Sequence, residues 1–393
     1  MKKLLVATAA MAAVSGIAHA QSSVTLYGII DDGLLFSTNS KGGHLYSLSS
    51  SILQGSRWGL RGSEDLGGGL KAIFVLENGF DPNTGKLAQG GLGFGRQAFV
   101  GLAGNYGSLT LGRQYDLVVD YVGVLGVARQ WGGIISAHPG DVDNFNNAYR
   151  VNNAIKYTSA NYGGLTFGGL YSPGGVAGDV TRNQIYSFGA GYTNGPLTLG
   201  AGYLNVRNPN VSFFGNSTSG TIATNVSNVT SPVYSGYGSA NTYQVIAAGG
   251  AYTFGAATVG ATYSNIRFLN LGSSYASAFA GQSVRFNSAE LNFRYQLTPA
   301  LLIGAAYHYT KGGDIDGQTG ATYHQGQLGV DYFLSKRTDV YLIGVYQHAS
   351  GNAVETNSKG VDVVMPAVAA INNLTPSSNQ NQAAVRVGIR HKF

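Results

Sequence analysis

The sequence predicts an all-β fold, a 16-stranded antiparallel transmembrane β-barrel with short periplasmic turns and long extracellular loops. Three observations predict it: charge is scarce, apolar and polar residues alternate along the strands, and short connections alternate with long ones. Only 11% of the 393 residues are charged, against about 25% in a typical soluble protein. Beyond the N-terminus, no run reaches the roughly 18 apolar residues of a spanning helix. A closed barrel is then the remaining way to cross a bilayer.

The N-terminus has the three parts of an export signal. Lys2 and Lys3 form a basic start, residues 4–17 are apolar and rich in alanine, and Ala18-His19-Ala20 is a small-x-small cleavage site. The apolar run is too short for a membrane anchor. We therefore expect residues 1–20 to be a signal peptide cleaved near Ala20, and residues 21–393 to form one barrel domain.

Composition excludes several classes of site. The chain has no cysteine, so disulfides and thiolate metal sites are absent. Its net charge is +6, or +4 once Lys2 and Lys3 leave with the signal, and no basic cluster with interleaved aromatic residues occurs, so no nucleic-acid partner is expected.

Period-2 alternation is clearest in two segments. In residues 290–297, Leu291, Phe293 and Tyr295 share one face, whereas Glu290 and Arg294 lie on the other. The last strand repeats the pattern and ends on Phe393. In a membrane barrel the apolar face touches lipid and the polar face lines the lumen.

The number of hairpins gives the strand count. Short turns rich in Gly, Pro and Asn occur at seven places, and each joins two strands: residues 63–69, 104–107, 161–164, 194–196, 254–256, 298–299 and 335–338. A first strand at 24–31 and a last at 384–393 bring the total to 16. The remaining connections are longer and polar: residues 36–52, 79–94, 115–148, 172–183, 205–241, 265–286, 311–324 and 349–382. We expect segment 205–241 to be an exposed loop.

The alternation also predicts which charged residues line the lumen. Because Trp58 and Leu60 point to lipid, Arg57 and Arg61 point inward. The same reasoning places ten basic and four acidic groups on the inner wall. The basic groups are Arg57, Arg61, Lys71, Arg96, Arg150, Lys156, Arg294, Arg386, Arg390 and Lys392, and the acidic groups are Asp31, Glu77, Glu290 and Asp331. His308, between Tyr307 and Tyr309, is also expected to face the lumen.

Several segments together resemble a known family. They are Val24-Thr25-Leu26-Tyr27-Gly28, Ser56-Arg57-Trp58-Gly59-Leu60-Arg61-Gly62, Gly95-Arg96-Gln97-Ala98-Phe99, Leu111-Gly112-Arg113-Gln114 and the C-terminal Val387-Gly388-Ile389-Arg390-His391-Lys392-Phe393. The chain resembles the general diffusion porins of Gram-negative outer membranes, of the beta-proteobacterial trimeric type. The resemblance spans the mature chain, strongly in the first five strands and at the C-terminus and weakly in the loops.

The resemblance implies a homotrimer in outer-membrane lipid and lipopolysaccharide, with the third long loop, about residues 115–149, folded into the lumen. It implies a basic wall at the constriction, matched here by Arg57, Arg96 and Arg150, and acidic partners on the loop. The candidate acids are Asp116, Asp120, Asp141 and Asp143. The terminal Phe393 resembles the family's signal to the barrel-assembly machinery.

Opposed charges across a narrow aqueous gap create a transverse field, and basic rings favour anions. The ten-to-four imbalance therefore predicts passive passage of ions and small hydrophilic solutes with a weak preference for anions. No enzymatic activity and no cofactor are expected. Segment 141–147 resembles the start of a calcium-binding loop. Such a loop needs Gly at its sixth position and Glu at its twelfth, but these positions are Asn146 and Asn152 here. A self-hydrogen-bonded polar loop is favoured there, and a bound cation is the alternative.

Three other functions remain open. An outer-membrane lipase or protease needs a nucleophile, a base and an orienting group together, and no motif brings them together. A secreted adhesin or solenoid predicts a fixed repeat period, whereas the spacing here is irregular. A substrate-specific channel needs a dedicated binding track, which a sequence does not reveal.

Overall fold

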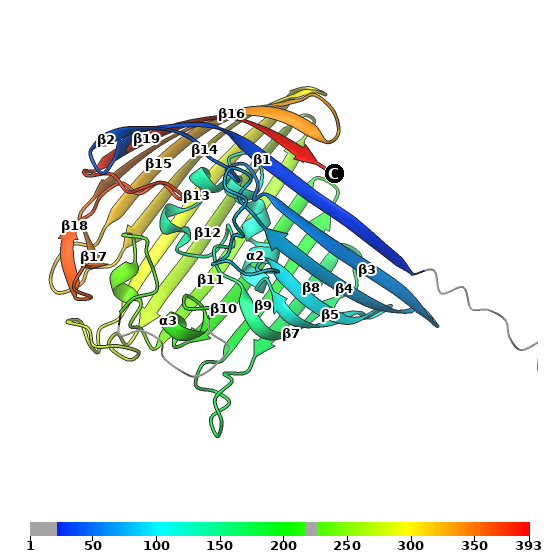
Figure 1. The fold of residues 1–393 in the computed structure, drawn as a ribbon, viewed down its shortest axis with the longest axis horizontal. Coiled ribbons are helices and arrows are strands. Elements are labelled where there is room, and N and C mark those ends of the chain that lie inside the picture. The colour runs from blue at the N-terminus through cyan, green and yellow to red at the C-terminus, as the bar shows by residue number, and fades with distance from the viewer. Residues whose placement is uncertain (1–21, 217–225) are drawn as a thin grey trace, which may run out of the picture.

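The computed structural model describes residues 22–216 and 226–393 and is a single closed barrel (Figure 1). Antiparallel pairing runs from β3 through each following strand to β16 and then to β19, and β1 closes the ring by pairing with β19 on one side and β3 on the other. At the seam, the backbone N–H and C=O of Gly28 exchange hydrogen bonds of 3.0 Å with Phe393. A ring closed in this way presents no open sheet edge to hydrocarbon, which confirms the predicted class of fold.

The strands follow one another around the wall. They are β1 (Ser23–Ser40), β2 (Gly43–Leu48), β3 (Arg57–Gly67), β4 (Leu70–Gly79), β5 (Gln97–Gly104), β6 (Gly107–Gln114), β7 (Val151–Ser159), β8 (Leu165–Ser172), β9 (Ile185–Asn194), β10 (Leu197–Arg207), β11 (Thr242–Phe254), β12 (Ala257–Leu269), β13 (Val284–Thr298), β14 (Leu301–Gly312), β15 (Thr322–Phe333), β16 (Thr338–Ser350) and β19 (Asn381–Lys392). A separate hairpin pairs β17 (Asn352–Thr356) with β18 (Asp362–Pro366).

The helices are short and lie in the connections. They are α2 (Leu117–Tyr121), α3 (Pro209–Ser212) and the 3₁₀ turns η1 (Gly123–Leu125), η2 (Val127–Arg129), η3 (Ile134–Ser136), η4 (Pro139–Asp141) and η5 (Ser235–Tyr237). No helix in residues 22–216 and 226–393 is long and apolar enough to cross a membrane.

In the described part of the chain the barrel sheet has 17 strands but 16 positions in the wall, because β2 and β3 share one. Both pair with the same side of β1, β3 with its first half and β2 with its second. The prediction of a loop at residues 36–52 is therefore wrong in part, because β1 continues to Ser40 and a tight turn connects it to β2. Alternation in this segment is too irregular to have indicated the added hairpin.

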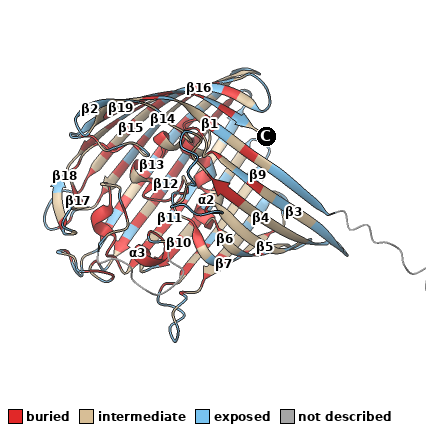
Figure 2. Cartoon of the chain, in the orientation of Figure 1, coloured by how far each residue is buried: buried red, intermediate tan, exposed pale blue. Residues whose placement is uncertain are grey.

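Each of the seven predicted turns joins consecutive paired strands. The first is tighter than expected, since β3 runs to Gly67 and β4 starts at Leu70. Figure 2 shows exposed and buried residues alternating along the wall. Leu291 is 60% exposed and Leu328 is 68% exposed on the outer face, whereas Gln325 and Arg386 on the inner face are fully buried. This matches a barrel whose apolar side faces lipid.

The long connections fold back onto the barrel. The prediction that segment 205–241 is an exposed loop is wrong for its described part. Four of its aromatic residues are buried in one cluster with Tyr243 of β11: Phe213, Phe214, Tyr234 and Tyr237. The hairpin β17–β18 contributes Val354 to the same cluster. The physical reason is composition, because this Asn- and Ser-rich segment also carries large rings that gain by leaving water.

The predicted signal peptide at 1–20 lies outside the described residues and stays a prediction. The assembly role of Phe393 likewise stays a prediction; its side chain is 42% exposed at the end of β19.

Candidate functional site: a charged cavity in the barrel

Segment 115–149 lies inside the barrel against the inner wall (Figure 1). Asp116 begins it by capping α2: its Oδ1 accepts the N–H groups of Val118 and Val119 at 2.9 and 3.1 Å. Small wall residues then let the helix lie close. An added Cβ at Gly189 of β9 would stand 2.5 Å from the Tyr121 ring, so only glycine admits that contact.

Trp131 fixes the middle of the segment. A Cβ at Gly304 of β14 would be 2.3 Å from its ring, and one at Gly329 of β15 would be 2.5 Å away. The indole therefore occupies the space that two missing side chains leave on adjacent strands. Ile134 continues the attachment, since its N–H donates to the Ile52 carbonyl at 2.7 Å.

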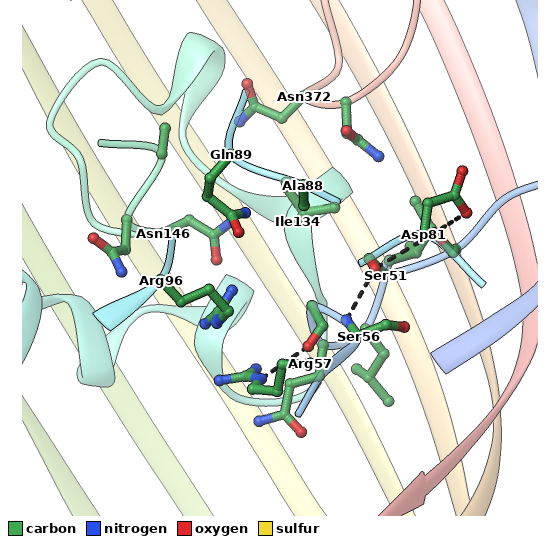
Figure 3. Close-up of a pocket in the computed structure, with 18 of the residues that line it drawn as sticks. Ser51, Ser56, Arg57, Asp81, Ala88, Gln89, Arg96, Ile134, Asn146 and Asn372 are labelled. Atoms are coloured by element: carbon green, nitrogen blue, oxygen red, sulfur yellow. Dashed lines mark hydrogen bonds between the residues drawn. The ribbon is translucent and has the colours of Figure 1, made fainter. Parts of the chain in front are cut away.

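A cavity of about 810 Å³ lies between this segment and the wall (Figure 3). Its walls come from residues 48–57, from the 80–96 connection, from segment 115–150 and from Asn372 and Asn373. Among the residues that the structure describes, six charged ones border it: Arg57, Arg96, Arg129, Arg150, Asp81 and Asp141. Four positive groups thus border this cavity together with two negative ones.

The arginines are held in different ways. Arg96 Nε donates to Glu77 Oε1 at 2.7 Å, and its Nη2 donates to the Tyr115 hydroxyl at 3.2 Å. Arg57 Nε donates to the Gly55 carbonyl at 2.8 Å. Arg150 Nη1 donates to the Ala148 carbonyl at 3.0 Å while its guanidinium lies 5.9 Å from the centre of the Tyr115 ring. Within the described part of the chain, Arg57 and Arg150 therefore have no carboxylate partner, and their charge remains directed at the cavity.

The other predicted lumen charges lie elsewhere. Arg61, opposite Val75 in the middle of β3, and Lys71, beside the turn between β3 and β4, are exposed and do not border the cavity. Lys156 forms an ion pair with Asp120 of α2. Asp31 is buried, where it accepts from the Tyr341 hydroxyl at 2.6 Å and lies 3.6 Å from Arg386.

The four loop acids do not act alike. Only Asp141 of the four borders the cavity. Asp116 is fully buried as the cap of α2, and Asp143 is buried between His138 and Ser264. For these two the expected acidic partnership with the arginine wall is wrong, because their oxygens are used to fasten the loop. Asp120 is engaged with Lys156 instead.

The Asp141 carboxylate has an unusual environment. It accepts the N–H groups of Asn146 and Ala148 at 2.8 and 3.0 Å, and its backbone φ is +50°. Burial, reinforced by the nearby charge of Asp143, raises the pKa of Asp141 to about 7. Its charge therefore changes near neutral pH.

Segment 141–147 uses most of its carboxylate and amide oxygens within the protein, although Asn147 Oδ1 has no partner among the described residues. Asp143 Oδ1 accepts from the Phe145 N–H at 3.3 Å, and Asn144 accepts from the Tyr149 N–H at 2.9 Å. These oxygens are thus engaged within the protein, which favours the self-hydrogen-bonded loop over the calcium alternative.

Sequence reasoning missed three features of the cavity. Arg129 lies in the loop, where strand alternation gives no orientation; its Nη1 donates to the Val119 carbonyl at 2.9 Å. Asp81 follows β4 and accepts from Ser50 at 2.9 Å. Residues 49–56 turn into the barrel, where Ile52 and Leu53 are buried against Ile135; their apolar character inside a polar stretch was the available signal.

The fold and this cavity define a transmembrane β-barrel with a polar, arginine-rich interior, the class of outer-membrane channels. The model of the Gram-negative porin family matches residues 7–352. The chain is 30% identical over its full length to outer membrane porin protein 32 of Delftia acidovorans, all of which is covered. It is 36% identical to an outer membrane porin of Bordetella pertussis over 52% of this chain and 59% of that one.

Among solved structures, an anion-selective porin from Comamonas acidovorans superposes with a TM-score of 0.69 and 25% identity, over 95% of this chain and 100% of that one. The chain belongs to the Gram-negative porin family and forms a diffusion channel in the outer membrane.

Proposed function

We propose that the cavity beside segment 115–149 is the constriction of this channel and that it gives the channel a weak preference for anions. The observation that carries the proposal is the set of six charges around the cavity, four arginines against two aspartates. Arg57, Arg96 and Arg150 form the basic wall, Arg129 adds to it from the loop, and Asp141 is the facing acid. Small hydrophilic solutes pass with the ions by diffusion.

The mechanism is electrostatic. Permeating anions exchange water for brief contact with guanidinium groups, and cations are repelled from the same space. Because Arg57, Arg129 and Arg150 have no carboxylate partner among the described residues, they contribute most of the field. Glu77 offsets the charge of Arg96. The structurally similar Comamonas protein is an anion-selective porin, which supports the same preference here.

Planar-bilayer recording tests the proposal. With a KCl gradient across the membrane, the zero-current potential should have the sign of chloride selectivity. A potential with the sign of potassium selectivity would refute it. The control is the same protein at high salt, where screening shortens the Debye length to about 3 Å at 1 M and the preference should shrink.

A trimer of such barrels, assembled in lipopolysaccharide-containing membrane by the barrel-assembly machinery, is also proposed; the porin relatives support oligomeric channels. Conductance steps in multiples of three, and a trimer on native gels, are expected.

A substrate-specific channel is the second candidate: saturation of conductance by one solute class at low concentration would favour it. We propose no catalytic activity for this channel. Turnover of lipid or peptide by detergent-purified protein would contradict this part of the proposal.

A further inference from the structure

Three side chains of metal-binding type meet where segment 115–149 touches the wall. His138 comes from the loop, Glu290 from β13 and His308 from β14, and their ligand atoms all lie within 4.8 Å of one another. Glu290 Oε2 is 3.0 Å from His308 Nε2 and 3.3 Å from His138 Nε2. All three residues are buried, and none borders the cavity described above.

The hydrogen bonds around His138 orient it toward this cluster. Its Nδ1 lies 2.6 Å from Asp143 Oδ2, which also accepts from the Ser264 hydroxyl at 2.6 Å. A carboxylate at Nδ1 retains the ring proton there and directs the Nε2 lone pair the other way. His138 Nε2 is buried and has no hydrogen-bond partner among residues 22–216 and 226–393. Carboxylate, histidine and an open Nε2 form the arrangement that commonly supports a metal-bound histidine.

His308 directs its Nε2 at the same carboxylate oxygen of Glu290, 3.0 Å away. The Gln327 side-chain amide nitrogen lies 2.9 Å from the same Nε2. Because an unprotonated imidazole nitrogen carries a single lone pair, metal binding through Nε2 requires the Gln327 amide to give up this contact. Without an ion, an Nε2–H that donates to Glu290 Oε2 gives the same 3.0 Å contact, and this is the alternative that the experiment below distinguishes.

We propose that His138, Glu290 and His308 bind a divalent transition-metal ion of the zinc type, which joins the lumen loop to the barrel wall. Zinc binds His nitrogen and carboxylate oxygen at about 2.0–2.2 Å, so neighbouring ligands of a tetrahedral site are about 3.3 Å apart. The two distances to Glu290, 3.0 and 3.3 Å, match this spacing. Two histidines and one carboxylate are a zinc ligand set with one position left open, whereas calcium requires six to eight oxygens.

The ion adds to a connection that Glu290 already makes. Glu290 Oε1 accepts the N–H of Val127 at 2.8 Å and is also bonded by the Asn292 amide. The Glu290 carboxylate therefore contacts η2 through Oε1. Through Oε2 and the ion it is connected to His138, which precedes η4. Occupancy fixes the loop without changing the charge that borders the cavity.

The test is metal content after refolding, because a buried site fills most readily as the chain folds. The full mature porin is refolded into detergent with zinc or with chelator, free metal is removed, and zinc is counted by mass spectrometry. We expect about one ion per protomer in the wild type and a resistance to heat unfolding that the chelator-treated protein lacks. His138→Gln and His308→Gln should each lose the ion and this added resistance. Asp143→Asn should weaken binding by about 10- to 100-fold.

His324→Gln on β15 is the matched control, since this histidine contacts Tyr307 on the outer face and its loss should leave zinc content unchanged. Where a variant fails to fold, anomalous diffraction at the zinc edge from wild-type crystals decides: the proposal requires a peak about 2.0–2.2 Å from all three ligand atoms. Three results would overturn the proposal: wild-type protein without zinc, equal zinc content in the wild type and the two histidine variants, or an anomalous peak elsewhere. Each would leave a shared proton as the explanation of the cluster.

Discussion

Replacing Arg57 by glutamine removes one of the four positive charges around the cavity and little else. Its guanidinium has a single hydrogen bond, to the Gly55 carbonyl, and no ion-pair partner in the part of the chain that the structure describes. The substitution therefore does not strip a buried carboxylate of its partner. Arg61→Gln is the matched control, because Arg61 lies four residues along the same strand and on the same face but does not border the cavity.

The size of the effect follows from the volume of the cavity. A sphere of 810 Å³ has a radius of about 6 Å, and a unit charge at that distance in water contributes about 0.7 kcal/mol. The charge favours chloride and disfavours potassium by equal amounts, so the permeability ratio changes by about 1.4 kcal/mol, or about tenfold, without screening. A Debye length of about 10 Å at 0.1 M salt reduces this to about fourfold, and at 1 M the change falls below about 1.5-fold.

The assay is the zero-current potential of the variants in planar bilayers at several salt concentrations. Arg57→Gln should lower the chloride-to-potassium permeability ratio about fourfold at 0.1 M, and Arg61→Gln should leave it nearly unchanged. Equal effects of the two substitutions would show that the whole inner wall, rather than this cavity, sets the preference. An effect of Arg57→Gln that does not weaken with salt would refute the electrostatic reasoning.

Three further outcomes are expected. Because the pKa of Asp141 is raised to about 7, its negative charge is lost as pH falls from 8 to 6, and the anion preference should rise. The substitution Asp141→Asn, which tolerates the positive φ, should abolish this pH dependence. A pH dependence that persists in the variant would assign it to another group. Asp116→Ala removes the α2 cap, at about 1 kcal/mol, and should speed hydrogen exchange in 117–121 about fivefold; unchanged exchange would mean that packing alone holds α2. Phe393→Ala should reduce the yield of membrane-inserted barrel, and a wild-type yield would remove its role as an assembly signal.

Strand alternation predicted the orientation of the wall but not the structure of the loops. Period 2 is a local property, so it directs Arg57 and Glu290 inward from their neighbours alone. In the structure Arg57 borders the cavity and Glu290 contacts Val127 of the loop. The loops are held by contacts distant in sequence: Asn372 donates to the His138 carbonyl at 2.6 Å across 234 residues. No local pattern encodes such a pair.

The roles of the acids illustrate the same limit. Asp116, Asp141 and Asp143 all occur in one polar loop, and nothing in their spacing separates a helix cap from a residue that borders the cavity. The separation depends on which oxygen meets which N–H after the loop has folded. Likewise, Glu290 and His308 were expected on the inner wall, but their meeting with His138 required the loop to lie against β13 and β14.

Anomalous diffraction from crystals soaked in bromide and, separately, in rubidium tests whether this cavity selects anions, because it locates permeating ions by the sign of their charge. We expect bromide density in the cavity within contact distance of Arg57 and Arg150, and no rubidium there. Rubidium density among these arginines, with bromide absent, would contradict it.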